Sequence, residues 1–166
     1  MESIENKFCR IAEAIIEEEK REIIEEAEKE CHRRREELEY AIKVLKYILE
    51  HPESRCLYCW DIGGCYTISG VTSLMKRIKE VYNLEKLSFE IVDPRESTEE
   101  SLARTWVEIE VYTTDTVETI IDRIRKKLAE LEDELKNLKA ADFVDKEKIK
   151  KLLLEQFALK NVCKTL

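Results

Sequence analysis

The chain has 166 residues, which is enough for one compact domain or for one domain with an extended helical segment. Charged residues make up 40% of it, far above the usual share of about a quarter, and 37 acidic against 29 basic residues give a net charge of −8. This acidic balance disfavours a large nucleic-acid-binding surface, which needs concentrated positive charge.

The composition also bears on source and compartment. Few amide side chains together with many Glu, Lys and Ile residues are typical of thermophilic proteins. Six cysteines fit the disulfide-rich intracellular proteins of hyperthermophiles, so we expect a hyperthermophilic archaeon or its virus as the source. A mesophilic protein that simply carries thiols is the alternative. With no secretory leader and no apolar run of about 20 residues, we expect a soluble, cytoplasmic protein without membrane contact.

Residues 3–50 contain neither glycine nor proline, and they predict one long helix. Ser3 is a suitable N-cap, and Pro52 marks the end, because the residue before a proline disfavours helical conformation. Apolar residues line one face at both ends of this helix but thin out in the middle. A continuous helix of this length measures about 70 Å, so we expect part of it to project, to break or to pack on another subunit. The apolar face begins with Ile4, Phe8, Ile11 and Ile15.

The following segment, 51–68, is a loop that holds four potential metal ligands. They are His51, Cys56, Cys59 and Cys65. The C-x2-C pair is the usual half-site of tetrahedral zinc, a third cysteine and a histidine complete a Cys3His set, and two adjacent glycines can supply the turn. The sequence therefore predicts a structural zinc ion as a possible cofactor, and no other cofactor. A disulfide from Cys56 or Cys59 to Cys65 or to distant Cys163 is one alternative, and buried thiols are another.

Two further cysteines, Cys9 and Cys31, lie on the long helix, too far apart to bond each other. They can pair with Cys163, pair across an antiparallel dimer, or simply be buried. Cys31 and His32 are not expected to form a catalytic pair, because neighbours on a helix point in different directions. The chain has no glycine-rich phosphate loop, nucleophile elbow or H-E-x-x-H motif, so we predict no catalytic residues.

Residues 69–113 predict a short helix and a β-hairpin. Ser69 can cap a helix over 70–82, and alternating apolar residues over 87–91 and 107–111 predict two antiparallel strands joined by a long polar loop. A helix followed by two strands is also the order found in winged-helix DNA-binding proteins. The acidic loop and the preceding cysteine-rich segment argue against that function, which we keep as an alternative. Its recognition residues are Ser73, Lys76, Arg77 and Lys79.

The two predicted strands carry three carboxylates on their polar face: Glu90, Glu108 and Glu110. Clustered carboxylates can hold Mg²⁺. A solvated sheet face is the more common explanation, and it is the one we expect here.

Two more helices follow. Asp115 and Glu118 form a capping box for a helix that extends to 139, and Asp145 can cap a final helix over 146–162. The first of these has the most regular periodicity in the chain, with apolar residues that alternate steps of four and three as in a coiled coil. This interaction seam consists of Val117, Ile121, Ile124, Leu128, Leu131, Leu135 and Leu138.

The sequence as a whole predicts an α+β fold that is mainly α. Its parts are a long N-terminal helix, a cysteine-rich loop, a short helix, a two-stranded antiparallel hairpin and two C-terminal helices with coiled-coil-like packing. We expect a helical arm over 1–50 and a small core over 51–166, divided at 51–68, 69–113 and 115–162, in one structural domain. The predicted function is a non-enzymatic interaction or regulatory protein that binds a protein partner or its own copies. Nucleic-acid binding through 70–113 and a metal-dependent enzyme at the cysteine-rich loop are the alternatives.

Overall fold

A computed structural model describes residues 2–96 and 103–164 of the chain. The predicted fold class is confirmed, since four α-helices dominate and one small antiparallel sheet accompanies them. In chain order the elements are α1 (Ile4–Glu50), β1 (Leu57–Tyr58), β2 (Cys65–Tyr66), α2 (Ile68–Tyr82), β3 (Lys86–Val92), β4 (Arg104–Tyr112), α3 (Val117–Lys136), the 3-10 helix η1 (Ala140–Phe143) and α4 (Lys146–Lys164).

The chain folds into two compact units. One, which we call the helical-pair unit, contains the chain up to Arg35 and from Leu138 onward, and the other, the sheet unit, is Glu36–Asn137. The helix α1 is continuous across this boundary. The sequence predicted a boundary at residue 50, where α1 ends. The boundary between the two compact units lies inside α1 instead, after Arg35, because the last part of that helix packs with the sheet.

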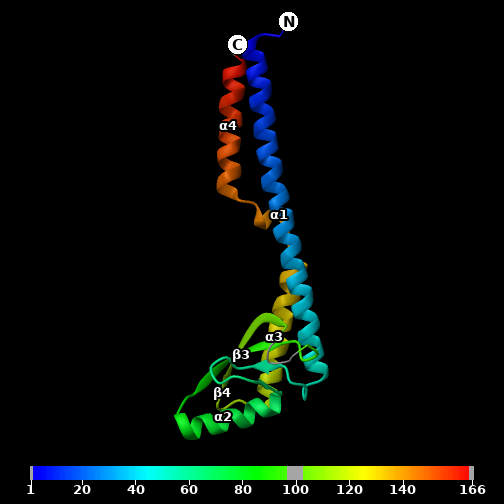
Figure 1. Ribbon diagram of the computed structural model, residues 1–166, viewed down its shortest axis with the longest axis vertical. Helices are drawn as coiled ribbons and strands as arrows, with labels where there is room; N and C mark the ends of the chain where they lie inside the picture. The colour runs from blue at the N-terminus through cyan, green and yellow to red at the C-terminus, as the bar shows by residue number, and fades with distance from the viewer. Residues whose placement is uncertain (1, 97–102, 165–166) are drawn as a thin grey trace. The chain divides into compact units, whose positions relative to one another are not determined.

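In the helical-pair unit, α4 lies antiparallel beside the first part of α1, so the start of α1 and the end of α4 lie at the same end of the pair (Figure 1). The buried face of α1 contains Cys9, Ile16 and Ala27, and α4 contributes the buried Leu152. The apolar face predicted from Ile4 to Ile15 is exposed instead. Adjacent residues of a helix point about 100° apart. Because Ile16 faces α4 and is buried, Ile15 points away from the interface and is exposed.

The sheet unit contains four antiparallel strands in the order β2-β1-β3-β4. The predicted hairpin is the pair β3 and β4, and the cysteine-rich segment adds two short strands to it. Tyr58 of β1 lies opposite Glu90 of β3, and Glu90 lies opposite Glu108 of β4. Beyond Glu90 the register of β3 and β4 shifts. Most of the predicted polar loop between these strands lies outside the described residues.

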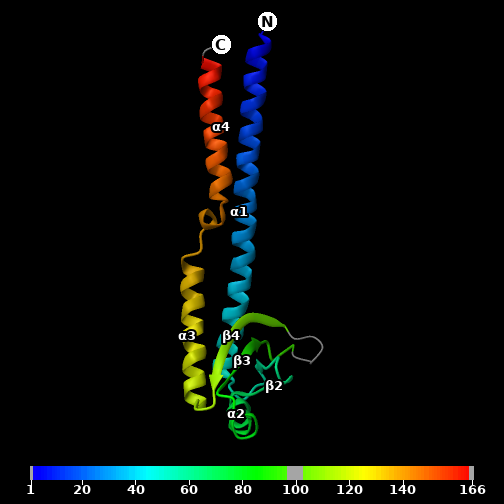
Figure 2. The ribbon, with the colours of Figure 1, turned by 90° about the vertical axis from the view of Figure 1, so that its left-hand side faces the viewer.

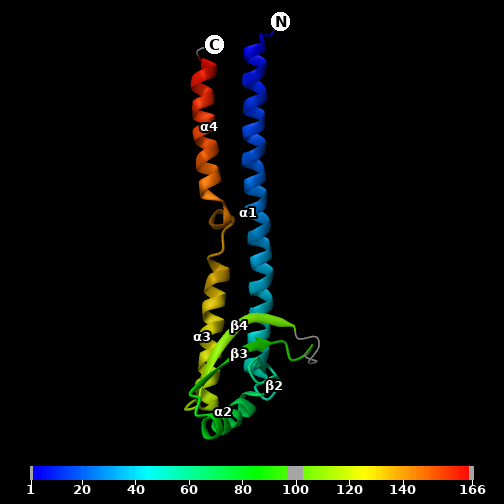
Figure 3. The ribbon, with the colours of Figure 1, turned by 60° about the vertical axis from the view of Figure 1, so that its left-hand side comes forward.

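One face of the sheet is covered by helices. Figures 2 and 3 show α3 running antiparallel beside the last part of α1, with α2 near the end of α1. The core between sheet and helices is continuous and apolar. Its fully buried members include Val44, Leu45 and Ile48 of α1, Val71 and Met75 of α2, Phe89, Ile91 and Val111 of the sheet, and Ile120 and Ile124 of α3.

Two helix starts differ from the prediction. The N-cap of α2 is Thr67 in place of Ser69, and its side chain accepts a hydrogen bond from the backbone N–H of Gly70. The capping box of α3 joins Thr116 and Thr119 in place of Asp115 and Glu118. Threonine and aspartate are both good N-caps, and Asp115 is engaged elsewhere, since it accepts two hydrogen bonds from the guanidinium of Arg123, at 2.8 and 3.1 Å.

None of the described helices is long and apolar enough to cross a bilayer.

Candidate functional site

The cysteine-rich segment folds as a tight hairpin. The backbone N–H of Cys56 donates to the carbonyl of Tyr66, and that of Cys59 donates to the carbonyl of Gly64. The turn needs positive φ angles at Gly63 (80°) and Gly64 (109°), which residues other than glycine rarely adopt. Gly63 and Gly64 therefore form the turn between β1 and β2, as the sequence indicated.

The four predicted metal ligands lie in different environments. Cys56 and Cys59 are fully buried within the core of the sheet unit, whereas Cys65 is half-buried. His51 is exposed, stacks on the ring of Tyr47, and places its Nδ1 atom 3.2 Å from the Tyr47 carbonyl oxygen. Among the described residues, no three His, Cys, Asp or Glu side chains converge into a metal-binding group. Structural zinc stays a prediction.

Cys56 behaves as a protonated core residue. Burial, with smaller contributions from Cys65 and Glu53, raises the pKa of its thiol to about 12. The thiol donates a hydrogen bond to the carbonyl of Ser54 at 3.0 Å. Cysteine in this state acts as a small apolar side chain with a weak donor, and Cys56 packs in the core of the sheet unit in this way.

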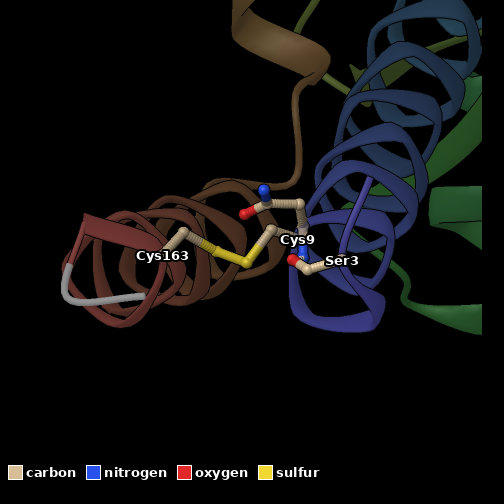
Figure 4. The surroundings of a disulfide bond; sticks show 4 residues. Ser3, Cys9 and Cys163 are labelled. Carbon is tan, nitrogen blue, oxygen red and sulfur yellow. Dashed lines mark hydrogen bonds between the residues drawn. A yellow bond between two sulfur atoms is a disulfide. The ribbon is translucent and has the colours of Figure 1, made fainter. Parts of the chain in front are cut away.

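A disulfide forms elsewhere, between Cys9 of α1 and Cys163 of α4 (Figure 4). It is one of the pairings that the sequence left open. Cys31 remains a thiol and is buried on α1, while the adjacent His32 is exposed. The two side chains point in different directions, as expected for helix neighbours.

The helical-pair unit exposes an apolar surface on α1, which we call the α1 stripe and define by Ile4, Phe8, Ile11 and Ile15. Ile4 is 83% exposed and Ile15, the most covered, is still 53% exposed. The unit also exposes Leu153 and Phe157 of α4. The residues of α4 that face α1 are instead Leu152 and Gln156, the latter hydrogen-bonded to Glu17 and Lys20 of α1.

The predicted seam of α3 packs only in part. Its first five members lie against the core of the sheet unit, but only Ile124 is fully buried, and Leu135 and Leu138 are half-buried. Ile120, which the seam omits, is fully buried. Its spacing of four residues from Ile124 is the signal that could have found it, because α3 turns this face toward α2 and the sheet.

The four residues of the predicted recognition helix, Ser73, Lys76, Arg77 and Lys79, are all exposed on α2. The element before α2 is the strand β2. Nucleic-acid binding stays a prediction. Of the three strand carboxylates, Glu108 and Glu110 are exposed as expected, but Glu90 is 4% exposed, which the alternation of the strand could not reveal.

Comparison with known proteins adds no relative. No family model, no curated protein and no solved structure matches this chain. Function must therefore be argued from the residues themselves.

Proposed function

We propose that this protein is a non-enzymatic interaction protein, and that its α1 stripe binds an α-helix of a second copy of the chain. The observation that supports this proposal is the exposure of Ile4, Phe8, Ile11 and Ile15 on a helix whose other side is already packed on α4.

An exposed row of large apolar side chains is costly in water, since each gains about 1.5–3 kcal/mol on full burial. Contiguous apolar surface of this kind marks interaction sites on folded proteins. The four residues follow one another at steps of four, three and four, which is the spacing of a coiled-coil seam. This spacing favours a helix as the occupant, because knobs-into-holes packing needs the same repeat on both partners.

Charge favours a second copy in antiparallel orientation. The stripe continues along the same face with Glu18 and Glu22, so its C-terminal end is acidic. Its N-terminal end carries Glu5 and Lys7, whose charges balance, together with the partial positive charge of the helix N-terminus. Antiparallel pairing brings Glu18 and Glu22 of one stripe to the helix N-terminus of the other, whereas parallel pairing places the same acidic residues of the two copies side by side.

The experiment is the molar mass of the protein by size-exclusion chromatography with light scattering, over a range of concentrations. We expect a dimer for the natural chain and a monomer for Ile11→Glu. Ile24→Glu is the matched control, since Ile24 is also a half-exposed isoleucine of α1 but lies outside the stripe. It should remain dimeric.

A monomeric natural chain at all concentrations would reject the second copy as the occupant. A dimer that Ile11→Glu leaves intact would reject the stripe as the interface. Circular dichroism on each variant separates loss of association from loss of helix.

A further inference from the structure

One arginine of the sheet unit, Arg104, lies within cation–π distance of both tryptophans of the chain. Trp60 follows β1, Trp106 lies in β4, and the guanidinium carbon of Arg104 is 4.1 Å from the ring centre of Trp60 and 5.8 Å from that of Trp106. The ring of Tyr58 meets that of Trp60 edge-on, with centres 4.4 Å apart. We call these residues the aromatic slot, and their electrostatics suit a cation, because the faces of indole rings are electron-rich.

A buried carboxylate lies against this slot. Glu90 is 4% exposed, and its Oε2 atom accepts a hydrogen bond of 2.7 Å from the indole N–H of Trp60. Its Oε1 atom is buried and has no hydrogen-bond partner among the described residues. An ionised carboxylate removed from water with an unpaired oxygen is strongly unfavourable unless a cation or further donors reach it. Oε1 of Glu90, which lacks a donor, therefore belongs to a side chain that contacts the aromatic slot through Trp60.

The backbone holds Trp106 in an unusual way. Its φ angle is 61°, in the left-handed region that bulky residues rarely adopt, and its side chain is 75% exposed. Strained backbone of this kind persists where the surrounding structure maintains it, and it is common at ligand sites. Packing does not explain the indole here, since most of it faces solvent.

We propose that Trp60, Trp106 and Glu90 bind an organic cation with an alkylammonium head group, as carried by a lysine side chain or a polyamine. In the absence of this ligand the Arg104 guanidinium lies against the indoles. A bound ammonium group replaces the Arg104 guanidinium against the indole faces and donates a hydrogen bond to Oε1 of Glu90. This proposal is independent of the α1 stripe, which belongs to the other unit.

The charges around the slot favour a cation over a nucleic acid, whose bases also stack on aromatic side chains. Glu108 lies opposite Glu90 in the sheet, and Glu110, two residues further along the same face of β4, pairs with Lys86 at 3.5 Å. Such carboxylates repel phosphate groups and attract ammonium groups.

The experiment uses intrinsic fluorescence of the full chain, because both tryptophans of the protein belong to the slot. Butylammonium chloride is titrated at constant ionic strength, with sodium chloride as the blank. We expect saturable changes in emission with butylammonium and none with sodium. Tetramethylammonium, which stacks on indole but donates no hydrogen bond, should bind more weakly.

Two variants test the roles of the charged residues. Glu90→Gln keeps an acceptor for Trp60 but removes the charge, and it should weaken binding by about tenfold or more, as expected for a buried bond to a charged group. Arg104→Gln removes the guanidinium from the indoles and should strengthen binding by up to about tenfold, the equivalent of one cation–π contact. Glu108→Gln is the comparison variant, since it removes an exposed carboxylate directly opposite Glu90 that attracts the cation only through solvent, and it should weaken binding much less than Glu90→Gln.

Absence of a saturable response in both the natural chain and Arg104→Gln would overturn the proposal. Equal losses of affinity in Glu90→Gln and Glu108→Gln would do so as well, since they would indicate general attraction to an acidic surface. Circular dichroism establishes that each variant is folded. A lysine-containing peptide that binds more tightly than spermidine assigns the cation to a protein side chain, and the reverse order assigns it to a free polyamine; either result retains the proposal.

Discussion

Cys9 and Cys163 are 154 residues apart in the sequence, yet a disulfide joins them, with their Cα atoms 6.1 Å apart. The bond links the start of α1 to the end of α4, so it closes the helical-pair unit at its terminal end (Figure 4). Apart from it, the two helices share a narrow buried face and the hydrogen bonds of Gln156 to Glu17 and Lys20. A covalent link is therefore a large part of what keeps α4 on α1.

Replacing both residues, Cys9→Ser with Cys163→Ser, should destabilise the protein by about 2–5 kcal/mol, the usual effect of removing a disulfide that closes a long loop. Urea unfolding followed by circular dichroism measures it. Reductant should shift the midpoint of the natural chain to that of the variant, and it should leave the variant unchanged. Equal midpoints for the natural chain with and without reductant would contradict a stabilising bond.

Removal of the Asp93 carboxylate should cost stability in a pH-dependent way. Hydrogen bonds from the Arg95 side chain, at 2.9 and 2.8 Å, lower the pKa of Asp93, against the opposing effect of burial and with help from the Arg95 backbone N–H. Because the folded pKa is below the unfolded value of about 3.9, the ionised group contributes stability above that pH, and the contribution disappears as the pH falls through the folded pKa.

Asp93→Asn should therefore destabilise the protein by about 1–3 kcal/mol near neutral pH, and the difference from the natural chain should shrink below about pH 4. Urea unfolding at several pH values measures this. Asp122→Asn is the control, because Asp122 pairs with Arg125 in full exposure and such pairs contribute little. A difference that is independent of pH would show that ionisation of Asp93 does not stabilise the fold.

Trp106→Gly should leave stability unchanged or raise it by up to about 1 kcal/mol. The left-handed backbone costs a residue with a side chain about 1–2 kcal/mol, which glycine avoids, while glycine loses more backbone freedom on folding. Glu108→Gly, at an exposed position of the same strand without positive φ, should instead lose about 0.5–1 kcal/mol. Thermal unfolding compares the two, and similar losses would argue against strain at Trp106.

Alkylation of the native protein should follow the burial of its thiols. Cys65 is half-buried, whereas Cys31, Cys56 and Cys59 are buried, so iodoacetamide should modify Cys65 first and the others only after unfolding. Peptide mass spectrometry gives the order. If the predicted zinc is bound, Cys65 should be protected as well and a chelator should expose it. Early modification of Cys56 or Cys59 would contradict their place in the core.

Much of the architecture was predictable because it depends on local rules. Helix α1 follows from a long segment without glycine or proline, and β3 and β4 follow from the alternation of Leu87, Phe89 and Ile91 and its counterpart in β4. Which face a helix buries was not predictable in the same way. Four isoleucine and phenylalanine residues at coiled-coil spacing near the start of α1 look like a core face, yet α4 packs beside them, on Cys9 and Ile16.

For the candidate sites, too, local properties were predictable from the sequence and contacts between distant segments were not. The sequence by itself determined which residues can act as turn formers and thiols, since these properties reside in single residues and their neighbours. Only the tertiary structure decided that Cys9 bonds to Cys163, that Cys56 and Cys59 enter the core, and that Trp60, Arg104 and Trp106 meet beside a buried Glu90. Such encounters depend on how distant segments are brought together, and local periodicity contains no information about that.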